Sequence, residues 1–164
     1  MAIIGHGDIA SALIDQQDKV FFASGVSNSS EKRESEYQRE IDLLLAQNKS
    51  HHLVYFSSLC IFYSNTRYAQ HKKIMESLVK KNFKHYTIIR LGNITWGNNP
   101  HTIINHFRND RKAGKPLEIQ DAYRYIIPNK AELQHWLAMI PEWNCEMNIT
   151  GKRMSIKQIV SEYI

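Results

Sequence analysis

Residues 52–58 read His-Leu-Val-Tyr-Phe-Ser-Ser, and residues 86–91 read Tyr-Thr-Ile-Ile-Arg-Leu. Both are apolar runs of strand length, and a helical pattern from about Tyr68 to Asn82 lies between them. A strand, a helix and a second buried strand in succession are typical of parallel pairing, because the crossover helix covers one face of the sheet. This stretch therefore predicts an α/β fold with a parallel sheet.

The rest of the chain continues this alternation in both directions. Further strands are expected at the apolar runs 2–4, 20–23 and 145–149. Helical patterns follow Gly5 to about Gln17, cover residues near 30–46, and begin again near Asn99-Pro100. Capping signatures that predict helix starts occur in three pairs: Asn28 with Glu31, Asn129 with Glu132, and Ser155 with Gln158.

Composition limits the class of protein. The chain has 164 residues, of which 43% are hydrophobic and 23% charged, so it suits one globular domain and argues against disorder. Two cysteines, Cys60 and Cys145, exclude a secreted disulfide scaffold. The apolar run at the amino end is too short for a signal peptide, and no stretch approaches the length of a spanning helix. We expect a soluble, cytoplasmic protein.

Charge alone does not select a partner. The formal net charge of +5 permits binding to nucleic acid, phosphorylated metabolites or anionic surfaces. No platform of interleaved aromatic residues accompanies the basic groups, so nucleic-acid binding is not expected. No cluster of histidine, cysteine and carboxylate has the spacing of a metal site, and none is predicted.

A glycine turn directly follows the first apolar run. Residues 5–10 read Gly-His-Gly-Asp-Ile-Ala, the Gly-x-Gly-x-x-Ala pattern whose backbone can approach a pyrophosphate at the start of a helix. An acidic residue about 20 positions later normally holds the ribose of the dinucleotide. Here that region reads Phe-Ala-Ser-Gly-Val-Ser and contains no carboxylate. The turn therefore predicts either a phosphate site or an ordinary connection without a ligand.

Tyr68 and Lys72 form a second candidate feature. They are four residues apart and share one helix face, so the ammonium is expected to lower the pKa of the phenol and make it a proton donor and acceptor. Ser57 and Ser58 end the preceding strand, where parallel sheets place their ligands, and a serine hydroxyl there could bind the same substrate oxygen. The alternative is a surface pair and two turn serines.

The order of these features resembles the short-chain dehydrogenase/reductase superfamily, in particular its extended NAD-dependent epimerase/dehydratase branch. The spacing of Ser58 from the aromatic Phe62 favours Ser58 over Ser57 as the matching serine. Further segments similar to the branch are residues 22–28, 55–62, 90–97, 124–128 and 148–156. The resemblance implies a reduced Rossmann-like parallel sheet covered by helices.

The resemblance also implies roles for individual residues. Tyr68 would be the acid and base, Lys72 would lower its pKa and hold the nicotinamide ribose, and Ser58 would orient the substrate oxygen. NAD or NADP would contact Gly5, Gly7, Asp8, Ile9, Ala23, Ser24, Gly25, Tyr68 and Lys72. The substrate, a nucleotide sugar, would contact Ser58, Asn93 and Arg124, with Arg90 as a further candidate for its diphosphate. A homodimer through the helices near 30–46 and 68–82 is implied as well.

The chain departs from the branch by being shorter. The βα units that carry the adenosine pocket are missing between Gln17 and Val20, so the first strand should lie at a sheet edge and dinucleotide binding should be weakened. We expect a single shortened domain over residues 1–164, with a small substrate-side portion within 98–144. The function implied is that of an NAD(P)-dependent sugar-nucleotide epimerase, dehydratase or reductase in surface polysaccharide biosynthesis. The alternative is a catalytically degenerate relative that binds nucleotides or serves as a scaffolding subunit.

Overall fold

A parallel sheet of five strands organises the chain. The computed structural model describes residues 3–164, and its large sheet has the order β1-β2-β3-β4-β7 with every neighbouring pair parallel. The strands are Ile3–Ile4, Lys19–Phe22, His52–Ser58, His85–Leu91 and Cys145–Ile149. Strand β1 lies at one edge, as the missing βα units predict. The expected α/β class and shortened parallel sheet are therefore confirmed.

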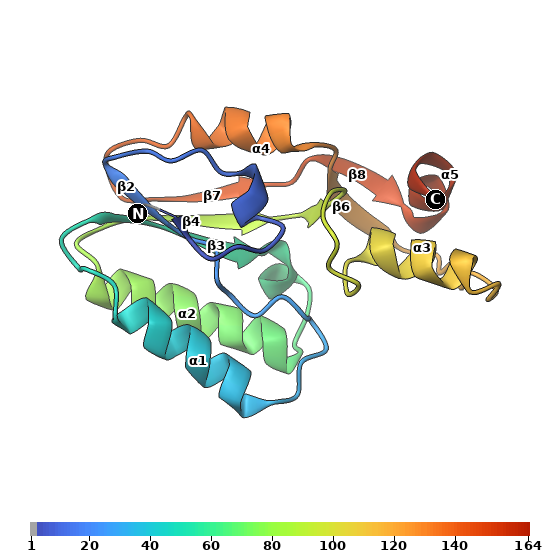
Figure 1. Cartoon of the computed structure of the whole chain (residues 1–164), viewed down its shortest axis with the longest axis horizontal. Coiled ribbons are helices and arrows are strands. Elements are labelled where there is room, and N and C mark those ends of the chain that lie inside the picture. The colour runs from blue at the N-terminus through green and yellow to red at the C-terminus, as the bar shows by residue number, and fades with distance from the viewer. Residues whose placement is uncertain (1–2) are drawn as a thin grey trace.

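Strand β3 shows why both faces of this sheet are covered. Leu53 and Tyr55 belong to the core beneath α1 (Glu34–Leu45) and α2 (Arg67–Asn82). Val54 and Phe56 point to the opposite core, beneath α4 (Lys130–Leu137) and the short turn η1 (Ala10–Ala12). Because successive side chains on a strand alternate between faces, this apolar run buries residues on both sides. Figure 1 shows α1 and α2 together below the sheet and α4 above it.

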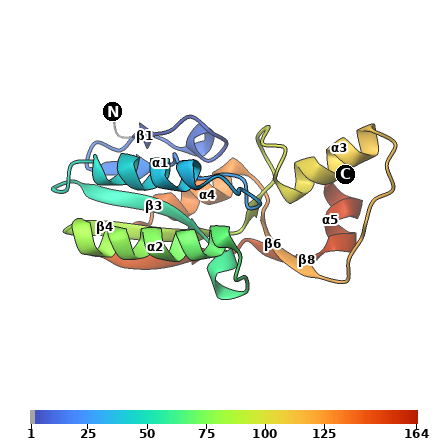
Figure 2. The same ribbon diagram turned by 90° about the horizontal axis from the view of Figure 1, so that it is seen from below.

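A second, smaller lobe extends from one end of the sheet (Figure 2). Its three strands have the order β5-β6-β8, with bounds Asn93–Ile94, Tyr123–Ile127 and Lys152–Ser155. Strand β8 runs antiparallel to β6, and helices α3 (Ile103–Lys112) and α5 (Ile156–Tyr163) pack with them around a separate apolar cluster. The lobe thus continues to the carboxyl end of the chain.

The predicted helix after the glycine turn is wrong. Only the single turn η1 forms, and Leu13 at its end is already extended. The connection from β1 must return along the sheet to start β2 in parallel at Lys19, and residues 13–18 are used for that return. The glycine turn therefore does not open a regular helix.

Two of the other five predicted helix starts also need correction. Asn28 accepts a hydrogen bond from Ser30 N in a local turn, while α1 begins at Glu34 after Arg33 without a side-chain cap. Helix α3 begins at Ile103 with Thr102 as its cap, rather than at Pro100. The caps Asn129 and Ser155 are confirmed, each accepting from the backbone N–H three residues later.

Asp8 connects the glycine turn to the loop that follows β5 through hydrogen bonds. Its carboxylate accepts hydrogen bonds from Asn98 N at 3.1 Å and Asn99 N at 2.9 Å, and its carbonyl accepts from Trp96 Nε1 at 2.9 Å. Gly97 has φ +93°, and a Cβ atom there would lie 2.0 Å from the Asp8 Cγ. Because a side chain at position 97 would overlap the Asp8 carboxylate, only glycine fits there.

The length and polarity of the helices decide whether any of them could span a membrane. Within residues 3–164, every helix is too short or too polar to cross a bilayer.

Replacing Gly97 with alanine tests the Asp8 contact. We expect Gly97→Ala to lower the free energy of unfolding by about 2 kcal/mol more than Gly114→Ala, as overpacking adds to the strain of a left-handed backbone. Gly114 is the matched control because its φ is +66° and a Cβ atom there would meet nothing within 4 Å. Urea unfolding measures both variants, and equal losses would show that Asp8 does not constrain Gly97.

Candidate active site

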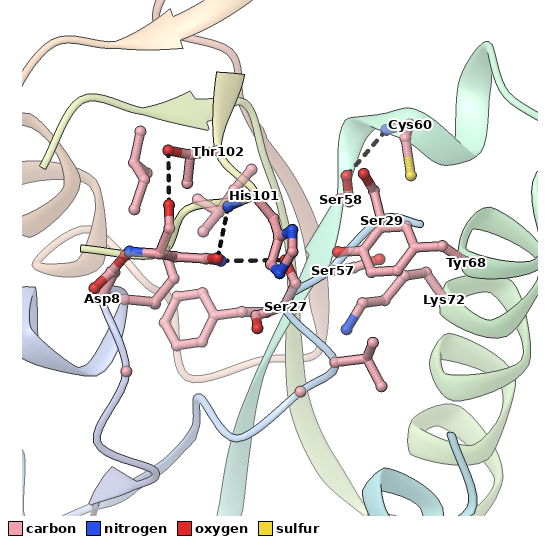
Figure 3. Close-up of a pocket in the computed structure, with 18 of the residues that line it drawn as sticks. Asp8, Ser27, Ser29, Ser57, Ser58, Cys60, Tyr68, Lys72, His101 and Thr102 are labelled. Atoms are coloured by element: carbon pink, nitrogen blue, oxygen red, sulfur yellow. Dashed lines mark hydrogen bonds between the residues drawn. The ribbon is translucent and has the colours of Figure 1, made fainter. Parts of the chain in front are cut away.

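A cavity of about 890 Å³ opens at the carboxyl ends of β2, β3 and β4. This is the position at which open parallel sheets bind ligands. Ser57, Ser58, Tyr68 and Lys72 enter it from the β3 and α2 side, and Asp8, His101 and Thr102 from the opposite side (Figure 3). The lining includes most of the predicted site residues: Gly7, Asp8, Ile9, Ala23, Ser24, Gly25, Ser58, Tyr68, Lys72, Asn93 and Arg124.

The two glycines of the turn have different surroundings. Gly5 has φ +114°, a Cβ atom there would lie 2.5 Å from Ala23 O, and the residue is not among those that line the cavity. Its structural role is close packing against the end of β2. Gly7 lines the cavity, and a Cβ atom there would meet nothing within 4 Å. The backbone at Gly7 is therefore open to a ligand, whereas that at Gly5 is not.

The two serines that end β3 are used differently. The Ser57 hydroxyl is buried and donates to Glu76 Oε1 at 2.7 Å. Ser58 is partly exposed, and its Oγ accepts from Cys60 N at 3.2 Å, which leaves its hydroxyl proton available. Of the two, Ser58 has the freer hydroxyl group.

Arginine side chains at the site are partly committed to other partners. Arg90 donates to both oxygens of Glu76 and also pairs with Glu146, and it does not line the cavity. The expected contact of Arg90 with a substrate diphosphate therefore has no support in this structure. Arg124 does line the cavity and donates to Tyr123 O at 2.9 Å. Asn93 donates from Nδ2 to Tyr125 O at 3.3 Å beside it.

Tyr68 and Lys72 share the cavity wall but are not hydrogen-bonded to each other. Lys72 Nζ lies 5.5 Å from the centroid of the Tyr68 ring. It donates instead to Glu40 Oε1 at 2.9 Å and to the Tyr55 hydroxyl at 3.1 Å. Burial raises the pKa of Tyr68, and the attraction of the Lys72 ammonium offsets only part of this rise. The expected lowering of the phenol pKa is thus wrong for the site without a ligand.

Glu40 is the residue that the sequence analysis missed. Its carboxylate is fully buried and also accepts hydrogen bonds from Val26 N at 2.8 Å, Tyr55 Oη at 2.7 Å and His71 Nε2 at 2.9 Å. Burial raises the pKa of Glu40, but Lys72 and these donors outweigh it and hold the pKa well below its ordinary value. Glu40 lies on the same helix face as Tyr37 and Leu44, and a carboxylate on that apolar stripe was the available signal.

Metal ligands do not gather at this site. Within residues 3–164, no group of three or more histidine, cysteine, aspartate or glutamate side chains is placed to hold a metal ion.

Comparison with known proteins identifies the fold but gives no sequence match. No protein-family model matches the sequence, and no curated protein does either. Among solved structures, a UDP-glucuronic acid 4-epimerase from Bacillus cereus, in complex with NAD and a fluorinated UDP-sugar, aligns with TM-score 0.66 and 16% identity. The alignment covers 94% of this chain and 60% of that one.

Two further solved structures also align with most of this chain at low sequence identity. A UDP-glucose 4-epimerase with UDP-glucose from Thermotoga maritima aligns with TM-score 0.68 and 14% identity, over 88% of this chain and 59% of that one. The capsular polysaccharide assembling protein CapF from Staphylococcus aureus aligns with TM-score 0.53 and 14% identity, over 88% of this chain and 43% of that one.

The chain spans about half the length of these enzymes, which fits the missing βα units. At such low identity the likeness establishes the architecture rather than the activity. The protein has, in shortened form, the Rossmann-like α/β fold of these solved structures.

Proposed function

We propose that the chain binds NAD or NADP in this cavity and acts on a nucleotide sugar as an epimerase, dehydratase or reductase. The observation that carries the proposal is that Ser58, Tyr68 and Lys72 meet on one wall of a cavity at the carboxyl ends of a parallel sheet. The solved structures of the same fold include complexes with NAD and UDP-sugars. CapF supports a place for the reaction in surface polysaccharide assembly. A cytoplasmic location stays a prediction.

The cavity fits one half of a dinucleotide better than the other. At the nicotinamide end, Lys72 retains an N–H after its hydrogen bonds to Glu40 and Tyr55, and Gly25 presents backbone without a side chain. Gly7 leaves room for a phosphate at the glycine turn. The adenosine end lacks the strands that normally follow β1, because β2 pairs directly with β1. Binding should therefore be weaker than in the full-length fold.

The roles of the chain's own residues follow from their positions. A nicotinamide ring, when bound, supplies a reversible acceptor for hydride. Ser58 can donate its free hydroxyl proton to the substrate oxygen and so orient it. Tyr68 can pass its phenolic proton to that oxygen or receive it back. Lys72 can bind a ligand hydroxyl while it remains paired with Glu40.

Gly7→Val tests dinucleotide binding at the glycine turn. We expect NADH affinity to fall by at least about tenfold, because the new side chain would occupy the space through which a phosphate reaches the backbone. Stability should hardly change, since a Cβ atom at Gly7 meets nothing within 4 Å. Isothermal titration calorimetry measures the affinity and urea unfolding provides the control. Undiminished affinity in the variant would remove the glycine turn from the binding site.

Tyr68→Phe tests the proposed chemistry. The variant loses the phenolic proton while keeping the ring, so turnover of a responsive nucleotide sugar should fall by about a hundredfold or more. NADH affinity should stay within a few fold of the unmodified protein. Turnover is followed by chromatography of the products from a panel of nucleotide sugars. Equal rates in the two proteins would exclude Tyr68 as the acid and base.

The second candidate function is that of a non-catalytic nucleotide-binding or scaffolding subunit. It is favoured by the loss of the helix after the glycine turn, where only η1 remains, and by the exposed position of β1 at the sheet edge. Calorimetry separates the two candidates. NADH binding accompanied by slow turnover supports the enzyme, whereas a chain that binds no dinucleotide supports the scaffold.

We also propose a homodimer through the outer faces of α1 and α2, which lie side by side on the sheet (Figure 2). Much of the expected apolar stripe is buried within the chain itself, including Tyr37, Leu44, Met75 and Val79. Leu45 and Ile74 remain exposed for a partner.

Ile74→Glu tests this interface. A charge there should shift sedimentation from dimer to monomer, because burying an unpaired carboxylate is costly. Ile119→Glu is the matched control, since Ile119 is as exposed as Ile74 (48% against 47%) but lies in the small lobe. A dimer that persists in Ile74→Glu would place the interface elsewhere.

A further inference from the structure

A buried ion pair lies beneath the cavity floor. Glu40, His71 and Tyr55 are fully buried, and Lys72 is nearly so. The side chains of Tyr55, His71 and Lys72 all form hydrogen bonds with the Glu40 carboxylate. These residues come from α1, α2 and β3, and Val26 N adds a donor from the loop between β2 and α1. A buried charge is tolerated only when it is paired and its hydrogen bonds are complete, and Glu40 meets both conditions.

Gly25 shows how closely this pair approaches the cavity. A Cβ atom on Gly25 would lie 2.7 Å from Lys72 Nζ and 2.9 Å from Glu40 Oε1. Its φ is not in the left-handed region, so space alone requires glycine there. The ammonium and the carboxylate therefore lie directly under the backbone of a loop that lines the cavity. The backbone at Gly25 therefore limits movement of the Lys72 ammonium toward the loop.

The same pair determines the charge near Tyr68. The titratable groups that most affect the Tyr68 phenol are Lys72 on its own helix, Glu40 and Tyr37 on α1, and Cys60 after β3, and Tyr55 on β3 interacts with it as well. Lys72 is the one cation among them, and Glu40 lies 2.9 Å from its ammonium. At that separation the carboxylate offsets part of the effect of the ammonium on the Tyr68 phenol. The resemblance implies that Lys72 lowers the pKa of the phenol, and in this structure the Glu40 carboxylate works against that effect.

We propose that Glu40 is a positioning residue, which fixes the Lys72 ammonium under Gly25 and offsets part of its charge while leaving one N–H for a ligand hydroxyl group. Burial and this carboxylate together keep the proton on Tyr68 in the site without a ligand. The part of the proposal that concerns a ligand rests on the proposed function. The effect of Glu40 on Lys72 and Tyr68 does not, and it can be measured without any cofactor.

The first measurement follows the ionisation of Tyr68 by ¹³C NMR of ring-labelled tyrosine, with the resonance assigned by Tyr68→Phe. In Glu40→Gln, the carboxylate no longer offsets the Lys72 charge, so the midpoint should fall by about 1 pH unit or more relative to the unmodified protein. Asp42→Asn is the matched control, because it removes the same charge from an exposed position on the same helix. A midpoint in Glu40→Gln no lower than that of Asp42→Asn would overturn the proposal.

The second measurement remains decisive if Glu40→Gln does not fold. Glu40→Asp keeps the charge but shortens the side chain, so Lys72 should lose its fixed position. Competitive acetylation, read by mass spectrometry, compares Lys72 with the exposed Lys73 of the same helix. We expect the relative reactivity of Lys72 to rise by about tenfold. An unchanged ratio would overturn the positioning role, whether or not the protein binds NADH.

Discussion

The buried carboxylate of Glu40 is the constraint on which the site depends. Removing one partner of a buried ion pair costs about 3–5 kcal/mol, so the donors around Glu40 cannot be rearranged independently. Its partners connect the loop after β2, the central strand β3 and helix α2. The two helices are therefore held in register with the strand whose end forms the cavity. Packing of the apolar faces alone would not define the position of Lys72 so closely.

The shortened sheet changes which sides of the cavity are surrounded by protein. With β1 at the edge and only a turn after the glycines, the half of the fold that normally surrounds adenosine is missing. The opposite side of the cavity is lined by residues of β3, β4, α2 and the small lobe. Asp8 links the two sides by binding the loop after β5. The described residues thus keep a cavity at the carboxyl ends of the central strands.

Much of this arrangement was predictable from local patterns. Strands β3 and β4, helix α2 and the caps Asn129 and Ser155 follow from apolar periodicity and capping residues. The glycine turn and the strand-end serine also lie on one cavity, as expected. The helix after the glycine turn failed because the return to β2 leaves too little chain, and that length depends on how β1 and β2 pair. The start of α1 at Glu34 was missed because Asn28 makes a local turn instead of a cap.

Local sequence patterns are enough to predict the alternation of strands and helices and the identity of the groups at the strand ends. Both depend on neighbours a few residues away, through periodicity, capping and turn chemistry. The electrostatics of the site, in contrast, depend on the three-dimensional arrangement of the chain. Glu40 reaches Lys72 across 32 positions of the chain, and burial then raises the pKa of Tyr68 more than the ammonium lowers it. Charge and desolvation act through space, so their balance depends on which side chains folding brings together.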